Sequence, residues 1–278
     1  MKKLLITLAM ACLSVAPAVG QTPKGEVKAG PVVHTAESRP LVVSQASIGL
    51  PASLTGAGVY VGPFSGMPAT LAPGKVPVVI FLHGSSGLGL KAIGEWQRWL
   101  ATLGIATIAP DSFALKGRLT YTSPIDKDTY ESIHALRGSE IGLVLEAART
   151  LPWIDTSRMV LAGTSEGAVS VARYQGNAFL GRIVFSWSCE DNYFVQSHAT
   201  AIPDNQPTLN IISSTDPYFS RSNGWLGAAP SAQGYCGEAL KGNKKASIVL
   251  IPGAPHTVLM FDQAKVPVEG FLRNLFGL

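Results

Sequence analysis

The segment from Arg158 to Tyr174 constrains the fold of this chain more than any other. Its apolar run Met159–Ala162 is typical of a buried strand, Gly163-Thr164-Ser165-Glu166-Gly167 follows at once, and the small residues after it indicate a helix. A serine held in a sharp turn between a strand and a helix projects its hydroxyl away from the backbone, while flanking glycines let neighbouring main chain pass close by. The pattern G-x-S-x-G is short, so its meaning depends on the elements around it.

Apolar runs of strand length alternate with helical patterns along most of the chain. We expect strands at 76–82, 105–109, 159–162, 183–187, 209–213 and 246–251, and helices at 92–103, 128–151, directly after Gly167 and at 266–278. Apolar strands separated by helices are typical of a parallel sheet that is covered on both faces. The sequence therefore predicts a single α/β domain over residues 75–278, a doubly wound and mostly parallel sheet with helices on both faces.

The first 20 residues have the composition of a secretory signal peptide. Lys2 and Lys3 precede a short apolar run that ends in the small residues Ala18-Val19-Gly20, and this run is short for a membrane span. We therefore expect an exported protein, periplasmic or secreted, with no stable membrane span after signal removal. A retained anchor helix and a lipidated Cys12 are the alternatives. Residues 21–74, rich in Pro, Gly, Ala and Ser, predict irregular chain and short antiparallel edge strands.

The composition bounds the class of protein and its partners. Hydrophobic residues make up 46% of the chain and charged residues 14%, which indicates a well-filled core. Loss of Lys2 and Lys3 with the signal lowers the net charge from +4 to +2, and the chain has no basic cluster that would bind nucleic acid. Export would bring Cys189 and Cys236 into an oxidising compartment, so we expect a disulfide between them. Two unpaired, buried thiols are the alternative.

Two side chains downstream of Ser165 directly follow predicted strands. Asp216 follows the strand at 209–213 and His256 follows the strand at 246–251. A serine hydroxyl is a weak nucleophile that needs a base within reach and a third group to hold that base. In chains with a serine at such a turn, the acid and the histidine come after it in this order, on loops at the carboxyl ends of later strands.

The sequence thus predicts Ser165 as nucleophile, His256 as general base and Asp216 as its acid partner. The rivals for the acid follow the preceding strand, and the remaining histidines do not combine a strand end with a place after Ser165. These alternatives are Glu190 and Asp191 for the acid, and His34, His83, His134 and His198 for the base.

Backbone N–H groups are expected to stabilise the negative charge of a tetrahedral intermediate. One donor is the main chain of Glu166, and the other comes from the loop His83-Gly84-Ser85-Ser86, with Ser85 favoured and Ser86 as alternative. Glu166 is assigned no acid or base role. We expect its carboxylate to point toward solvent or toward a neighbouring basic group.

The loop at 217–240 is long for a connection between strands, and such loops often shape a pocket. Aromatic residues gather in this loop and near the end of the neighbouring strand: Tyr218, Phe219, Trp225 and Tyr235, with Trp187, Tyr193 and Phe194. Trp187, Tyr218 and Phe219 are the candidate pocket residues, for an apolar or aromatic group of a small-molecule substrate. The alternative is that these rings only pack the loop down. A bridge between Cys189 and Cys236 would tie this loop to the strand end and steady Asp216.

From about residue 76 to the C-terminus, the sequence resembles the dienelactone hydrolase family of α/β hydrolases, especially its exported members. The resemblance rests on motifs spread over two thirds of the chain: Phe81-Leu82-His83-Gly84-Ser85-Ser86-Gly87, Pro110-Asp111-Ser112-Phe113, Arg137, the elbow at 163–167, Pro252-Gly253-Ala254-Pro255-His256, and the placing of Cys189 and Cys236. Two features depart from the family. Ser165 stands where the best-known members have a cysteine, and Lys116 and Arg118 flank Gly117 where similar relatives have an arginine.

These observations predict a serine hydrolase that cleaves carboxylic esters through a Ser-His-Asp triad and an acyl-enzyme intermediate. A small-molecule ester is the expected substrate, and neither a metal nor an organic cofactor is expected. An amidase or peptidase on the same fold is one alternative, since the fold hosts both reactions. A non-catalytic binding protein of the cell envelope is the other.

Overall fold

The computed structural model describes residues 24–221, 223 and 232–278, so the predicted signal segment 1–20 and Trp225 lie outside the described residues. An eight-stranded sheet with the order β10-β9-β8-β7-β4-β5-β2-β3 forms the centre of the molecule. Its strands are β2 (Ser47–Leu50), β3 (Tyr60–Pro63), β4 (Val76–Leu82), β5 (Ala106–Ala109), β7 (Ile154–Thr164), β8 (Gly181–Phe185), β9 (Thr208–Ser213) and β10 (Ala246–Ile251). Two further short strands, β1 (Val27–Lys28) and β6 (Thr120–Tyr121), pair with each other in antiparallel fashion.

Six neighbouring strands of the sheet, from β10 to β5, run parallel. β4 is buried along its whole length, as expected for an apolar strand covered on both faces. β2 is antiparallel to both β5 and β3, so the N-terminal segment extends the sheet at one edge. The carboxyl ends of β4, β7, β9 and β10 therefore lie on the same side of the sheet, at the ends of its parallel strands. The loops that carry His83, Ser165, Asp216 and His256 begin there.

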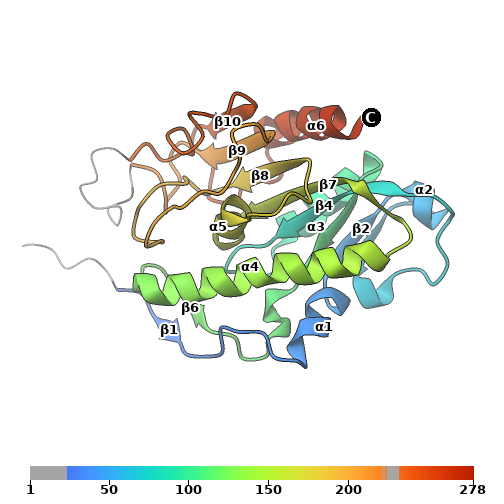
Figure 1. Cartoon of the computed structure of the whole chain (residues 1–278), viewed down its shortest axis with the longest axis horizontal. Coiled ribbons are helices and arrows are strands. Elements are labelled where there is room, and N and C mark those ends of the chain that lie inside the picture. The colour runs from blue at the N-terminus through green and yellow to red at the C-terminus, as the bar shows by residue number, and fades with distance from the viewer. Residues whose placement is uncertain (1–23, 222, 224–231) are drawn as a thin grey trace, which may run out of the picture.

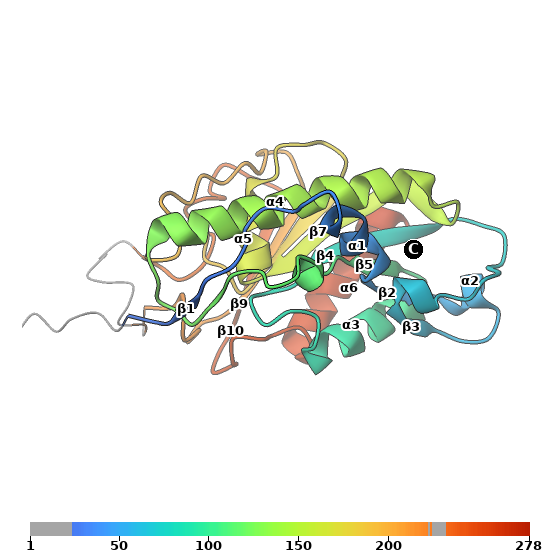
Figure 2. The same ribbon diagram turned by 90° about the horizontal axis from the view of Figure 1, so that it is seen from below.

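Helices cover both faces of this sheet. They are α1 (Ser38–Ser44), α2 (Ala52–Thr55), α3 (Lys91–Thr102), α4 (Lys127–Thr150), α5 (Glu166–Arg173) and α6 (Asp262–Phe276), with short 3-10 helices η1 (Phe64–Gly66) and η2 (Ser112–Ala114). Apolar side chains of α4 and α5 fill a core on one face, and those of α3 and α6 fill a second core on the other. Figure 1 shows α4 running along the sheet, and Figure 2 shows α3 and α6 on the side opposite α4.

The predicted α/β architecture is confirmed. β4 and β10 have the expected bounds, and the N-terminal segment does supply antiparallel edge strands. β8 ends at Phe185 rather than at residue 187, and Ser186, which follows, adopts a positive φ of 50°. α6 begins at Asp262, four residues before the expected start, and accommodates Pro267 within the helix. In the part of the chain that the structure describes, no helix is both long and apolar enough to cross a bilayer.

Candidate active site

Ser165 occupies a strained turn between β7 and α5. Its backbone angles are φ 54° and ψ −120°, a conformation rarely adopted by a residue with a side chain. The two glycines of the motif permit this turn: a Cβ on Gly163 would lie 2.8 Å from Val171 Cγ2, and a Cβ on Gly167 would lie 2.4 Å from the carbonyl oxygen of Leu82. Any larger residue at Gly167 would thus push α5 away from the end of β4.

Asp216 and His256 form a hydrogen-bonded pair at the ends of β9 and β10. His256 Nδ1 lies 2.7 Å from Asp216 Oδ2. The other carboxylate oxygen, Oδ1, accepts the main-chain N–H groups of Tyr218 at 2.9 Å and Phe219 at 3.0 Å. Asp216 is completely buried, whereas the His256 side chain remains 21% exposed. The carboxylate is therefore fixed from both sides, and the imidazole it holds can still meet a ligand.

The loop carrying His256 is itself anchored to the neighbouring strand ends. Ser213 Oγ donates to the carbonyl oxygen of Ala254 at 2.6 Å, and Ser186 Oγ donates to the carbonyl oxygen of His256. The Tyr218 ring packs edge-on against the imidazole, with 4.6 Å between the ring centroids. These contacts restrict the imidazole to one place relative to β9 and β10.

A cavity of about 290 Å³ joins Ser165 to His256. Its lining residues come from six segments of the chain: Ser85, Ser86, Tyr121, Thr122, Ser123, Ser165, Tyr193, Phe194, Tyr218, Phe219 and His256. The predicted residues Tyr218 and Phe219 are among them. Trp187 is not: its side chain is fully buried and packs edge-on against Phe219, with 5.0 Å between ring centroids, so it supports the wall from behind. No sequence motif marks residues 121–123, so their place in the cavity wall could not be predicted from the sequence.

The loop after β4 lies directly against the nucleophile position. A Cβ on Gly84 would lie 3.3 Å from Ser165 Cβ, so the main chain of this loop approaches the serine closely. Ser85 and Ser86 both line the cavity. Glu166 is the first residue of α5, where a main-chain N–H has no acceptor within the helix. The two expected groups of N–H donors thus come from the two segments that flank Ser165.

His83 orients the start of this loop. Its ring is buried, with Nδ1 2.7 Å from the carbonyl oxygen of Gly84 and Nε2 3.2 Å from the main-chain nitrogen of Ser112. Burial, and then the charge of Arg137, hold the pKa of His83 well below its usual 6.5. The ring is therefore neutral, with the proton on Nδ1 donated to Gly84 and Nε2 acting as an acceptor.

The Glu166 carboxylate does not point toward solvent, because the residue is completely buried. Its Oε1 lies 2.6 Å from Arg118 Nη2, and its Oε2 accepts a hydrogen bond from the Tyr121 hydroxyl at 3.0 Å. The alternative of a neighbouring basic group is thus the correct one. Arg118 is engaged in this buried pair, whereas Lys116 is exposed on the surface.

The expected disulfide is present. Cys189 and Cys236 are joined with an S–S distance of 2.04 Å. The main-chain N–H of Cys236 also donates to Asn210 Oδ1 of β9 at 3.0 Å. The bridge therefore ties the loop that follows Asp216 to the segment after β8. Of the rival acids, Glu190 accepts main-chain N–H groups of Gln233 and Gly234, and Asp191 pairs with His198 at 2.9 Å outside the cavity.

Two buried histidines make the stability depend on pH. Burial lowers the pKa of His134, and burial with Arg137 lowers that of His83, below the 6.5 of an unfolded chain. Below pH 6.5 these two histidines therefore bind protons in the unfolded state that they do not bind in the folded state. We expect the free energy of unfolding to keep its full value above pH 6.5. Below pH 6.5, each histidine should lower it by up to about 1.4 kcal/mol per pH unit.

Unfolding by guanidinium chloride at pH 7 and at pH 5 measures this loss. In His134→Gln the loss should be smaller but should largely remain, because the pKa of His83 lies further below its usual value. An unchanged free energy in the parent protein would contradict the prediction.

The strand order, the helices on both faces and the position of the serine turn define an α/β-hydrolase fold. The chain is similar to a protein assigned as a dienelactone hydrolase from Klebsiella pneumoniae subsp. pneumoniae MGH 78578, with 16% identity over 83% of this chain and 98% of that one and a TM-score of 0.52. Acylaminoacyl peptidase from Pyrococcus horikoshii has 16% identity over 78% of this chain and 39% of that one, with a TM-score of 0.50. Est1E from Butyrivibrio proteoclasticus has 17% identity over 74% and 89%, with a TM-score of 0.47. No protein-family model and no curated protein match the sequence. The expected resemblance to dienelactone hydrolases therefore holds at the level of the fold.

Proposed function

We propose that this protein is a serine hydrolase that cleaves carboxylic esters, with Ser165, His256 and Asp216 as its catalytic triad. The observation that carries the proposal is the 2.7 Å pair between His256 and a completely buried Asp216, in a cavity that Ser165 also lines. A neutral imidazole held in this way has one nitrogen left to accept a proton. The three residues also follow one another in the order that this fold requires.

In the proposed reaction, Ser165 Oγ attacks the acyl carbon while His256 Nε2 takes its proton. The Asp216 carboxylate keeps the imidazole in the tautomer with the proton on Nδ1 and stabilises the imidazolium that forms. The main-chain N–H groups of Glu166 and Ser85 stabilise the oxyanion of the tetrahedral intermediate. His256 then protonates the leaving alcohol. In the second half of the reaction, water attacks the acyl carbon while His256 takes its proton, and His256 returns that proton to Ser165 Oγ as the acid leaves.

The cavity favours an uncharged ester with an aromatic or short apolar group. Its walls combine five aromatic rings with the hydroxyls of Ser85, Ser86, Thr122 and Ser123, and the described lining includes no Lys, Arg, Asp or Glu. Arg118, one of the two basic residues that flank Gly117, has its charge balanced by Glu166. Aromatic walls with a few hydrogen-bonding groups suit a small neutral ligand.

Labelling with a fluorophosphonate tests the proposal. We expect the reagent to modify Ser165 in the purified protein and to lose this reaction in His256→Ala, because the hydroxyl then lacks its base. A folded sample that does not label would contradict the hydrolase assignment. Matched p-nitrophenyl esters and p-nitroanilides then separate ester from amide cleavage, and faster turnover of the anilide would favour a peptidase.

We also propose that the chain is exported. The disulfide between Cys189 and Cys236 supports this, since such bonds persist in oxidising compartments. Fractionation of expressing cells, with detection of the mature N-terminus, tests it. Retention of residues 1–20 in the cytoplasmic fraction would contradict it.

A further inference from the structure

Glu166 lies at the centre of a buried group of charges behind the candidate active site. Besides Arg118 at 2.6 Å and the Tyr121 hydroxyl at 3.0 Å, its carboxylate lies 3.6 Å from Arg137 Nε. Burial opposes ionisation of Glu166, but the two guanidinium groups outweigh it and place the pKa of Glu166 below its usual range. The carboxylate is therefore charged, although no part of it reaches solvent.

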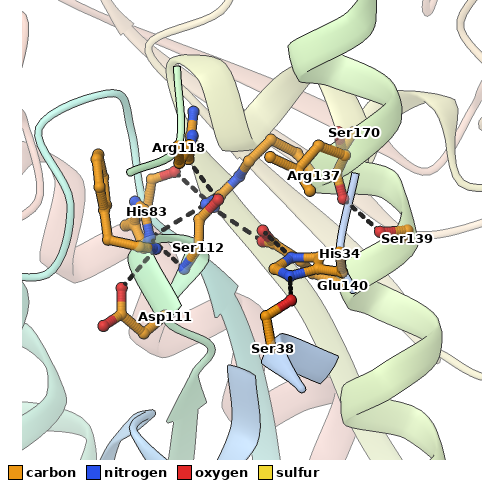
Figure 3. Close-up of polar contacts among 12 residues, drawn as sticks. His34, Ser38, His83, Asp111, Ser112, Arg118, Arg137, Ser139, Glu140 and Ser170 are labelled. Carbon is orange, nitrogen blue, oxygen red and sulfur yellow. Dashed lines mark hydrogen bonds and ion pairs between the residues drawn. The ribbon is translucent and has the colours of Figure 1, made fainter. Parts of the chain in front are cut away.

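Arg137 links this group to the loop on the other side of Ser165. Its Nη2 donates to the carbonyl oxygen of His83 at 2.9 Å, and its Nη1 lies 3.1 Å from His83 Nε2. Nη1 also pairs with Glu140 at 3.2 Å. Figure 3 shows Arg137 reaching from α4 toward His83, with Glu140 and His34 beyond it. The segment at 83–86, which carries the candidate donor Ser85, is thus held by Arg137, one of the two cations that hold the side chain of Glu166.

The charges in this group balance. Arg118 and Arg137 supply two positive charges, Glu140 and Glu166 supply two negative charges, and each of the four side chains is at most 1% exposed. Buried ion pairs are weak stabilisers, because the cost of removing the ions from water offsets most of their attraction. Well-packed apolar side chains would stabilise such a core as effectively. The arrangement therefore calls for a role that apolar packing cannot fill, and fixed geometry is such a role.

We propose that the Glu166 carboxylate is a positioning group for the oxyanion hole, and this rests on the proposed function. The main chain of Glu166 supplies one N–H donor. Its side chain is anchored to Arg118 and Arg137, and Arg137 anchors His83 two residues before the other donor, Ser85. One network thus fixes both donors relative to Ser165, and through the Tyr121 hydroxyl it also fixes a wall of the cavity. Oxyanion stabilisation depends on such placement, because donors must lie where the charge develops.

The variant Glu166→Gln tests this role, since it keeps the main-chain donor and the size of the side chain. We expect kcat on a neutral ester to fall by about tenfold to a hundredfold, less than the loss of a whole donor, with KM changed by less than about threefold. The ground-state ester does not need the donors as the transition state does, so the loss belongs in kcat. Rates are divided by the active sites titrated with fluorophosphonate, which removes any contribution from unfolded protein.

The matched control is Glu131→Gln. Glu131 on α4 pairs with Arg173 on α5 at 2.6 Å. The control variant therefore breaks an ion pair between the same two helices, but away from Arg118 and His83. We expect its kcat to stay within about twofold of the parent value, because substitutions near the surface usually have small effects. A loss equal to that of Glu166→Gln would mean that helix docking, and not the buried network, sets the rate.

A second variant serves if Glu166→Gln fails to fold. Arg118→Met with Glu166→Gln removes one charge of each sign and leaves Arg137 paired with Glu140, so it avoids an uncompensated buried charge. Because the anchor of Glu166 is still gone, its kcat should remain at least about tenfold below that of the parent. Titrated sites with the parent kcat, in either variant, would overturn the positioning role. A parent protein that neither labels nor turns over esters would instead overturn the proposed function.

Discussion

Replacing Ser165 by alanine is expected to lower kcat/KM on an activated ester by about 10⁴-fold to 10⁶-fold. The variant loses the only proposed nucleophile, so no acyl-enzyme can form, and the remaining N–H donors can only assist direct attack by water. The turn itself should persist. The main-chain N–H of Ser165 donates to the carbonyl oxygen of Phe185 at 3.1 Å, and this contact needs no side chain.

Steady-state hydrolysis of a p-nitrophenyl ester measures this effect. The control is Ser170→Ala, which removes a hydroxyl from the same helix, α5, where Ser170 Oγ donates to the carbonyl oxygen of His134 outside the cavity. This control should keep kcat/KM within about threefold, because only a structural hydrogen bond is lost. If Ser165→Ala retained more than about a tenth of the activity, another residue would have to be the nucleophile.

The sequence predicted best those strands whose apolar runs lie between clear turn residues. β4 and β10 carry such runs, and their bounds match the prediction, although only β4 is buried along its whole length. The segment before β4 was predicted less well. β2 depends on pairing with β5, which lies more than fifty residues later, and α1 contains Pro40 in its first turn, which obscures a helical pattern.

The candidate site divides in the same way. Ser165, Asp216 and His256 could be predicted because each directly follows a strand, and the fold dictates their order. The buried partners of Glu166 could not. Arg118 and Arg137 reach it from a loop and from α4, so their meeting depends on side-chain packing that no local motif encodes. His34, from the N-terminal segment, reaches the same network through Glu140 at 3.2 Å. The N-terminal segment thus contributes a side chain to the buried group of charges behind the site.

Asp216→Asn is expected to lower kcat by about ten-thousandfold with little change in KM. Asp216 Oδ1 accepts two main-chain N–H groups, so the oxygen of an asparagine amide would take this place and its NH2 would face His256 Nδ1. The imidazole would then have to accept at Nδ1 and carry its proton on Nε2. In this tautomer it cannot take the proton of Ser165, although its position is unchanged.

The pair Asp191 and His198 provides the matched control, because it repeats the carboxylate–imidazole contact at 2.9 Å outside the cavity. Asp191→Asn should leave kcat within about twofold of the parent, as an exposed pair contributes little. The two variants also decide which strand end carries the acid. A large loss in Asp191→Asn with near-parent rates in Asp216→Asn would move the acid to the loop after β8. The reverse result, with a thermal midpoint unchanged in both, would place the defect of Asp216→Asn in the tautomer of His256.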